Sequence, residues 1–229
     1  MIQKIRKELK SLKNHEKAKV LQRYFKTGKG EYGEGDIFLG LTSEQIKNVA
    51  KKYPSLDLPE LKKLLSGKIH EERVCALRIL TIKYKKADEK EKKLIVDFYL
   101  KNSKGINNWD LVDLSCYPIL GDHLLDKDKK NLYRLARSKN LWQRRIAIIS
   151  TYAFIRQNKF DDTIKIAKVL LKDQHDLIQK AVGWMLREVG KRDKKILINF
   201  LKLHHLEMPR VMLRYSLERL SKEERKKYL

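Results

Sequence analysis

The chain has 229 residues, enough to bury a sizeable core as one domain or as one continuous array of repeats. Its 53 lysines and arginines outnumber 29 acidic residues, and the net charge of +24 favours a polyanionic partner, first nucleic acid and second an anionic membrane surface. No apolar run approaches the length of a membrane span and the first residues lack the apolar core of a signal peptide, so we expect neither a membrane protein nor a secreted one.

The N-terminal segment from Met1 to Lys19 is lysine-rich and amphipathic, and it is predicted to form the first helix of the fold. A targeting peptide is the less favoured interpretation, because Glu8 and Glu16 interrupt the basic pattern. The two cysteines, Cys75 and Cys116, lie within apolar helical patterns and are predicted to be buried thiols. They fit a reducing, cytoplasmic setting.

Apolar residues recur at helical spacing along almost the whole chain, and nothing indicates a strand ladder. Thr42 and Gln45 form a capping box, which predicts a helix that ends near Tyr53 and Pro54. The same spacing predicts further helices at about 58–66, 70–86, 88–102, 107–120, 127–138, 140–157, 161–172, 176–190, 193–205 and 209–220.

Several helical segments repeat at a regular interval. Four of them begin 37, 35 and 35 residues apart, a fifth follows after 30, and an amphipathic helix precedes each one. A two-helix unit with this period is typical of an α-solenoid of the HEAT or armadillo kind, in which equivalent helices line one concave wall. The segments are RVCALRIL from Arg73, DLVDLSCY from Asp110, RIAIISTY from Arg145, KAVGWMLR from Lys180 and RVMLRYSL from Arg210.

A glycine-rich segment, KTGKGEYGEGDIFL from Lys26 to Leu39, interrupts the helical pattern. Gly28, Gly30 and Gly33 satisfy the G-x-G-x-x-G pattern, but the segment follows a helix and no βαβ unit surrounds it, which excludes a dinucleotide site. No G-K-[ST] follows, which excludes a P-loop. We interpret the segment as an irregular surface loop, with contact to a ligand backbone as the alternative.

The stretch GINNWDLVDLSCYPILGDH, residues 105–123, presents an aromatic residue next to a carboxylate. A helix places Trp109 and Asp113 on one face, with Asp110 and Tyr117 beside them. Pro118 lacks an N–H group and should kink or end this helix. The opposite face is predicted to be core and carries Leu111, Val112 and Ile119.

The helix around Trp184 has an apolar stripe formed by Ile178, Ala181, Val182, Met185 and Val189. Trp184 lies on the opposite side, where its neighbours at helical spacing are the cations Lys180, Arg187 and Lys191. Two interpretations are open. The ring either packs against the next repeat under the aliphatic stems of these neighbours, or it meets a ligand.

Arg145 lies in the segment at about 140–157, which is apolar almost all round and should be well buried. An unpaired buried charge is very unfavourable, so Arg145 needs an anion, either a structural carboxylate or a bound phosphate. Asp113, on the preceding repeat, is a candidate for that carboxylate. Asp113 is itself open to two interpretations, the ordering of an arginine and catalysis.

The six histidines show neither HExxH nor paired CxxC spacing, so no metal is expected, and no Ser-His-Asp or nucleophile-elbow signature occurs. The residues alone therefore predict a basic helical solenoid that is compatible with binding or with catalysis. Its concave wall would carry Trp109, Asp113, Arg145 and Trp184.

At these residues the chain resembles the DNA alkylation repair enzymes of the AlkD family, which are HEAT-like-repeat DNA glycosylases. The matching stretches follow the family order over most of the chain. They are RYFK with FLGL (23–26 and 38–41), NWDLVD with ILGD (108–113 and 119–122), LWQRRIAI (141–148) and QKAVGWMLRE (179–188). The chain departs from the family at Asn108, where some members have a second tryptophan, and in its longer GEYGEGD loop.

The resemblance implies cleavage of the N-glycosidic bond of cationic N3- or N7-alkylated purines in duplex DNA, without metal or cofactor. Asp113 would stabilise the oxocarbenium-like sugar, and Trp109 and Trp184 would pack around the lesion. Arg145 would hold a phosphate or orient Asp113, and the N-terminal tyrosine of the family falls on Tyr24. Cations predicted to bind phosphates are Lys180, Arg187, Arg210 and Arg214.

We therefore expect one HEAT-like-repeat domain over residues 1–229, a cytoplasmic monomer that is nucleoid-associated in a prokaryote. Its expected partner is double-stranded DNA containing alkylated bases, with no membrane. The alternatives are a non-catalytic HEAT-repeat solenoid that binds nucleic acid and a protein-interaction scaffold. The combination of Trp109, Asp113, Arg145 and Trp184 favours the enzyme, because a carboxylate inside a phosphate-binding groove lowers affinity.

Overall fold

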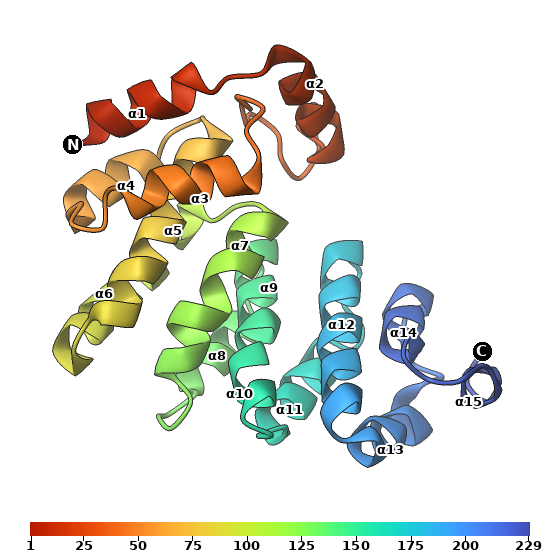
Figure 1. Cartoon of the computed structure of the whole chain (residues 1–229). Coiled ribbons are helices and arrows are strands. Elements are labelled where there is room, and N and C mark those ends of the chain that lie inside the picture. Colours follow the sequence, from red (N-terminus) through yellow and green to blue (C-terminus); the bar gives the residue numbers. More distant parts are fainter. The chain divides into compact units, whose positions relative to one another are not determined.

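The computed structural model describes residues 1–229, and every regular element in it is helical (Figure 1). Its one β feature is an isolated parallel bridge between Ile37 and Ile69. None of the helices is both long and apolar enough to cross a bilayer. The predicted all-α fold is confirmed. The chain divides into two compact units, Met1–Ser115 and Cys116–Leu229, which are described in turn.

The first unit is built around the long helix α5 (His70–Lys86), which is buried on most of its surface from His70 to Leu80. Helices α3 (Ser43–Lys51), α4 (Leu58–Leu65) and α6 (Glu89–Lys101) all pack against α5. The other elements are α1 (Ile2–Ser11), α2 (His15–Tyr24), the 3-10 turn η1 (Ser103–Gly105) and α7 (Trp109–Cys116), whose last residue lies just past the boundary.

The second unit is organised around α12 (Asp176–Arg192), which packs against α9 (Leu141–Ser150), α13 (Lys194–His204) and α14 (Arg210–Leu217). As predicted for this apolar segment, α9 is buried continuously from Arg145 to Ser150. The other elements are the π-helix η2 (Tyr117–Gly121), α8 (Lys130–Ala136), α10 (Tyr152–Arg156), α11 (Asp161–Val169) and α15 (Lys222–Lys226).

The two-helix units predicted from the sequence period are present in both units. The five repeated segments lie on α5, α7, α9, α12 and α14, and the helices that precede them are α4, α6, α8, α11 and α13. This pairing fits HEAT-like repeats. A single domain with one concave basic groove stays a prediction.

Several local predictions are confirmed. Thr42 and Gln45 form both bonds of the capping box at the start of α3. The α-helical geometry ends before Pro118, where the chain continues as a π-helix. Cys75 and Cys116 are buried thiols, and burial raises the pKa of Cys75 to about 12. The predicted core face of α7 and η2 is fully buried at Leu111, Val112 and Ile119.

Two predicted helices are divided in the structure. The segment 1–19 is not one helix, because Asn14 is extended and its side chain accepts a bond from the Lys17 N–H at 2.9 Å, which starts α2. The segment 140–157 is broken at Thr151, whose hydroxyl donates to the Ile148 carbonyl at 2.7 Å and competes with the helical bonds. The short helix α15 is not apparent from the apolar spacing, because none of its residues is buried.

Candidate functional site

Trp109 opens α7 and packs on the end of α2. Its ring stacks on Phe25, with the centroids 5.0 Å apart and 6° between the ring planes. Tyr24 meets the Trp109 ring edge-on at 5.9 Å and stays 63% exposed. The Asn108 side chain accepts the Trp109 N–H at 2.8 Å, which begins the helix at this residue. The structure thus brings together Tyr24 and Trp109, two of the residues singled out from the sequence.

The aromatic stack continues from Trp109 into the core. Phe25 stacks on Phe38 at 5.0 Å, and Phe38 stacks on His70 at 4.4 Å. Four rings therefore run from the half-buried Trp109 to His70, which is almost fully buried. Aromatic pairs at such separations each stabilise by about 0.5–1.5 kcal/mol beyond their buried area, so the stack holds the Trp109 ring firmly.

His70 lies between two carboxylates. Its Nδ1 atom is 3.1 Å from Asp36 Oδ2, and its Nε2 atom is 2.8 Å from Asp110 Oδ2. Burial by itself lowers the pKa of His70, but the hydrogen bonds to Asp110 and Asp36 outweigh burial and raise the pKa above its ordinary value of 6.5. The imidazolium form is therefore stabilised. Because Asp110 directly follows Trp109, this bond ties the start of α7 to α5.

Asp36 follows the last glycine of the glycine-rich segment and is buried in the same cluster. Arg73 Nη2 lies 2.5 Å from Asp36 Oδ2, and Arg73 Nη1 donates to Asn107 Oδ1 at 2.5 Å. Burial would raise the pKa of Asp36, but the hydrogen bonds from His70 and Arg73 outweigh burial and lower it. The segment before Asp36 is irregular and mostly exposed, as predicted, and it brings this carboxylate into the core.

Glu71 and Glu72 complete a run of four buried charged residues at the start of α5. The Glu71 carboxylate accepts bonds from the N–H groups of the FLGL stretch at 2.8 to 3.3 Å. Glu72 accepts a bond from Arg6 Nε at 3.1 Å. The HEER run, residues 70–73, therefore cross-links α1, the FLGL stretch, the glycine-rich segment and α7.

A cavity of about 520 Å³ opens beside Trp109. Asp113 lines it and is half-buried, one helical turn after Trp109. Most of the wall is apolar or aromatic, so the field of a carboxylate is screened less here than in water. The polar lining residues are Ser43, His70, Glu71, Arg78, Asp110 and Asp113, and the others are Leu21, Tyr24, Phe25, Phe38, Leu41, Ile46, Val74, Trp109 and Leu114.

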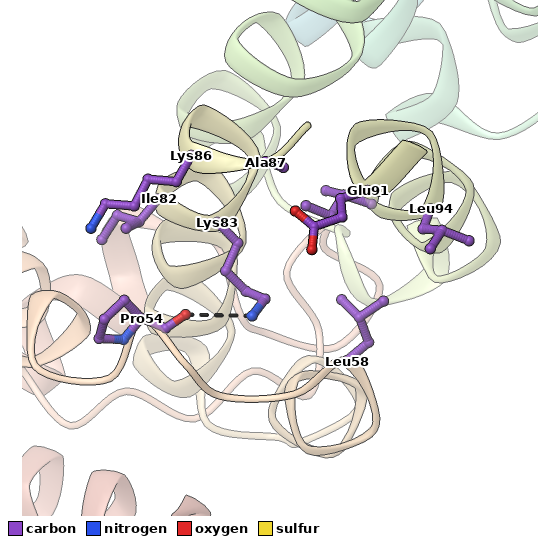
Figure 2. Close-up of a pocket in the computed structure, with 9 residues that line it drawn as sticks. Pro54, Leu58, Ile82, Lys83, Lys86, Ala87, Glu91 and Leu94 are labelled. Atoms are coloured by element: carbon purple, nitrogen blue, oxygen red, sulfur yellow. Dashed lines mark hydrogen bonds between the residues drawn. The ribbon is translucent and has the colours of Figure 1, made fainter. Parts of the chain in front are cut away.

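A second cavity of the first unit, of about 300 Å³, lies between α5, α6 and the turn at Pro54 (Figure 2). Lys83 crosses its edge and donates to the Pro54 carbonyl at 3.4 Å. Its walls are largely aliphatic, and none of the residues predicted to form the site lines it. We therefore place the candidate site of this unit in the larger cavity.

Trp184 lies on α12 opposite the predicted apolar stripe, whose five residues are almost fully buried. The Trp184 ring is half-buried, 6.4 Å from the ring of Tyr152, which in turn meets Tyr117 edge-on at 5.3 Å. Its Nε1–H group donates to Glu188 Oε1 at 3.2 Å. Trp184 is thus held by residues of its own unit and keeps part of its surface exposed.

Arg145 is 5% exposed, in agreement with the predicted burial. Its Nη1 atom donates to the Leu177 carbonyl at 2.5 Å, which links α9 to the first turn of α12. Arg145 belongs to the second unit and Asp113 to the first, so the expected pairing between them stays a prediction.

The four cations predicted to bind phosphates all lie in the second unit. Lys180 forms an ion pair with Asp176 at 2.8 Å, and Arg187 forms one with Glu218. A phosphate would have to displace these partners or share the cation with them.

The other two cations, Arg210 and Arg214, lie on the exposed surface of α14. Arg210 Nη1 donates to the backbone carbonyl of Leu229 at 3.2 Å, whereas Arg214 lines a cavity of about 540 Å³ together with Lys180. This cavity brings two of the predicted cations to one place.

Several residues that organise the site are not singled out by the sequence analysis, namely Asp36, His70, Arg73 and the two glutamates between them. A signal is present, because HEER opens a strongly apolar helix, and buried charged residues need partners. Phe25 and Phe38 lie within the stretches RYFK and FLGL. The partners themselves are 30 to 66 residues away, which no local pattern reveals.

Comparison with known proteins adds two findings. The chain matches the model of the family described as DNA alkylation repair enzyme over residues 5–220. A solved structure described as a predicted DNA alkylation repair enzyme from Enterococcus faecalis has the same fold, with a TM-score of 0.70 over 92% of this chain and 97% of that chain, at 18% sequence identity. No curated protein matches the chain.

Proposed function

This chain belongs to the family of DNA alkylation repair enzymes, and we propose that it is a DNA glycosylase of base excision repair that removes cationic N3- or N7-alkylated purines from duplex DNA. A purine alkylated at N3 or N7 already carries a positive charge. It leaves as a neutral base without a general acid, so catalysis depends on stabilising the cationic, oxocarbenium-like sugar.

The observation that carries the proposal is the half-buried carboxylate of Asp113 in a largely apolar cavity, one turn from Trp109. A fixed negative charge in such a place stabilises a developing cation more strongly than it would in water. We assign to Asp113 the electrostatic stabilisation of the sugar and the positioning of the attacking water.

The aromatic residues have a complementary role in this proposal. Trp109 would present its π face to the deoxyribose, where developing positive charge is favoured. Tyr24 is mostly exposed and would contact the DNA backbone next to the lesion. Trp184 would pack on the backbone from the second unit, and Arg145 would hold a phosphate or orient Asp113.

DNA binding would depend on the excess of positive charge. The cations Lys180, Arg187, Arg210 and Arg214 would contact phosphates, so affinity should fall steeply with salt. Lys180 and Arg187 already have carboxylate partners, so their net contribution is smaller than that of Arg214. A DNA substrate places the protein with the chromosome, in the cytoplasm and at the nucleoid in a prokaryote, and we propose that it acts as a monomer.

The decisive experiment is release of free base from methylated duplex DNA by the wild type and by Asp113→Asn. We expect the wild type to release 3-methyladenine or 7-methylguanine and the variant to be at least about 100-fold slower, the size typical of removing one transition-state interaction. Binding of undamaged duplex should be unchanged or tighter, because a charge that repels phosphate is removed.

The matched control is Asp97→Asn, which changes an exposed carboxylate on α6 in the same unit. It should leave base release unchanged. Full turnover by Asp113→Asn would contradict the assigned role. Salt-sensitive DNA binding without release of any base by the wild type would make the protein a non-catalytic solenoid, and retention of a protein in preference to DNA would make it a scaffold.

A further inference from the structure

Arg78 is a cavity residue to which the proposed function assigns no role. It lies on α5 and lines the same cavity as Trp109 and Asp113. Its Nη2 atom donates to Ser43 Oγ at 2.6 Å, while its Nε atom is buried without any hydrogen-bond partner. A half-buried guanidinium that has one neutral partner is left with most of its hydrogen-bonding capacity unused.

The other partly or fully buried arginines of the first unit are both paired. Arg6 binds the carboxylate of Glu72 at 3.1 Å, and Arg73 binds that of Asp36 at 2.5 Å. No carboxylate forms an ion pair with Arg78. Burial lowers the pKa of Arg78, and this effect outweighs the attraction of the nearby carboxylates Glu44 and Asp110, which raises it.

Two carboxylates on the cavity wall are engaged with other groups. Asp110 accepts the bond from His70 Nε2, and Glu71 accepts the N–H groups of the FLGL stretch. The cavity therefore contains a cation that feels the charges of Glu44 and Asp110 but forms no ion pair with either, in a chain whose overall charge favours polyanions.

We infer that Arg78 binds a backbone phosphate of the DNA strand at the cavity beside Asp113. This inference rests on the proposed function, because the polyanion is DNA. A guanidinium binds phosphate through paired N–H groups, and the pair that Arg78 can present is on its two Nη atoms, whose one bond is that from Nη2 to Ser43. A physical need exists as well. The carboxylate of Asp113 repels the phosphate that must lie near it, and Arg78 on the same wall offsets this repulsion.

The test is binding of undamaged and alkylated duplex by Arg78→Gln, measured over a series of salt concentrations. We expect about tenfold weaker binding of both duplexes, and a slope of log affinity against log salt that is smaller by about 0.9, the value for one lost phosphate contact. Arg78→Lys keeps the charge and should keep the slope. Lys86→Gln removes one exposed charge from the same helix outside this cavity and should leave both quantities unchanged.

Unchanged affinity and slope in Arg78→Gln would overturn the inference. A loss confined to guanine-containing or alkylated sites would also overturn it, because that pattern indicates contact with a base edge. If Arg78→Gln fails to fold by circular dichroism, the decision falls to Arg78→Lys. Weaker DNA binding by Arg78→Lys with an unchanged salt slope would then support the phosphate contact. An affinity and a slope equal to those of the wild type would contradict it. Absence of base release by the wild type would defeat the glycosylase proposal alone, since this assay measures binding.

Discussion

Replacement of His70 by glutamine should destabilise the first unit in a pH-dependent manner. His70 is only 2% exposed and makes two charge-assisted bonds, to Asp110 and Asp36. Each bond to a charged group is worth about 1.5 kcal/mol at the low end, and glutamine replaces at most one of them. Asp36 keeps Arg73 and Asp110 is 22% exposed, so we expect a loss of about 1.5 kcal/mol if glutamine replaces one bond and about 3 kcal/mol if it replaces neither.

The pH dependence has a definite sign. The pKa of His70 is raised in the folded protein, so its contribution is complete below the unfolded value of 6.5 and is lost as pH rises through the higher, folded pKa. The pKa of Asp36 is lowered, so its contribution to stability is lost only as pH falls below the unfolded value of 3.8, far below the range in which His70 titrates. The stability difference between wild type and His70→Gln should therefore be largest below pH 6.5 and shrink at higher pH.

Urea unfolding followed by circular dichroism, at pH values from about 5.5 to about 9, measures this difference across the range in which histidine titrates. Comparing the two proteins at each pH cancels the titration of groups that they share. A difference that stays constant over the whole range would refute the view that the buried imidazolium ties α7 to α5. A difference that grows with pH would show that His70 is neutral in the folded protein.

Two further predictions concern the support of the site. Gly40→Ala should destabilise the protein by about 3 kcal/mol in thermal unfolding, because Gly40 has a φ of +87° and an added Cβ would overlap the Asn14 carbonyl. The matched control is Gly30→Ala, at a φ of +78° with open space around the added Cβ, which should lower the stability by only about 1 kcal/mol. Phe25→Leu should lower base release by up to about tenfold through loss of the ring beneath Trp109, with unchanged affinity for undamaged duplex. Unchanged release in Phe25→Leu would show that the stack does not position Trp109.

The sequence predicts most helices because their apolar periodicity is local. The core stripe of α12 and the capping box of α3 follow from residues three or four positions apart, and the structure places them as predicted. The two helices that are predicted too long are divided where a polar side chain bonds to the backbone. Asn14 and Thr151 each form a side-chain bond that ends or starts a helix, and apolar spacing does not register such bonds.

The sequence predicts the candidate site only in part, because the contacts that support it join residues far apart in the chain. Trp109 and Asp113 are neighbours on one helical turn, so their common face follows from spacing alone. The support beneath them is non-local, since His70 meets Asp110 across 40 residues and Asp36 across 34. The FLGL stretch meets Glu71 across 30 to 32 residues. Such contacts depend on the packing of helices, and the sequence indicates only that buried charges require partners.

The proposed chemistry explains why so many buried charges surround a site with one catalytic carboxylate. If the leaving purine needs no proton, the rate depends on the distance between Asp113 and the cationic sugar. With an effective dielectric constant of about 20, moving these charges from about 4 Å to about 5 Å apart weakens their attraction by about 0.8 kcal/mol. This change lowers the rate about fourfold. The bond from His70 to Asp110 and the ring stack under Trp109 restrain the helix that carries Asp113, so in the proposed mechanism they would assist catalysis without touching the substrate.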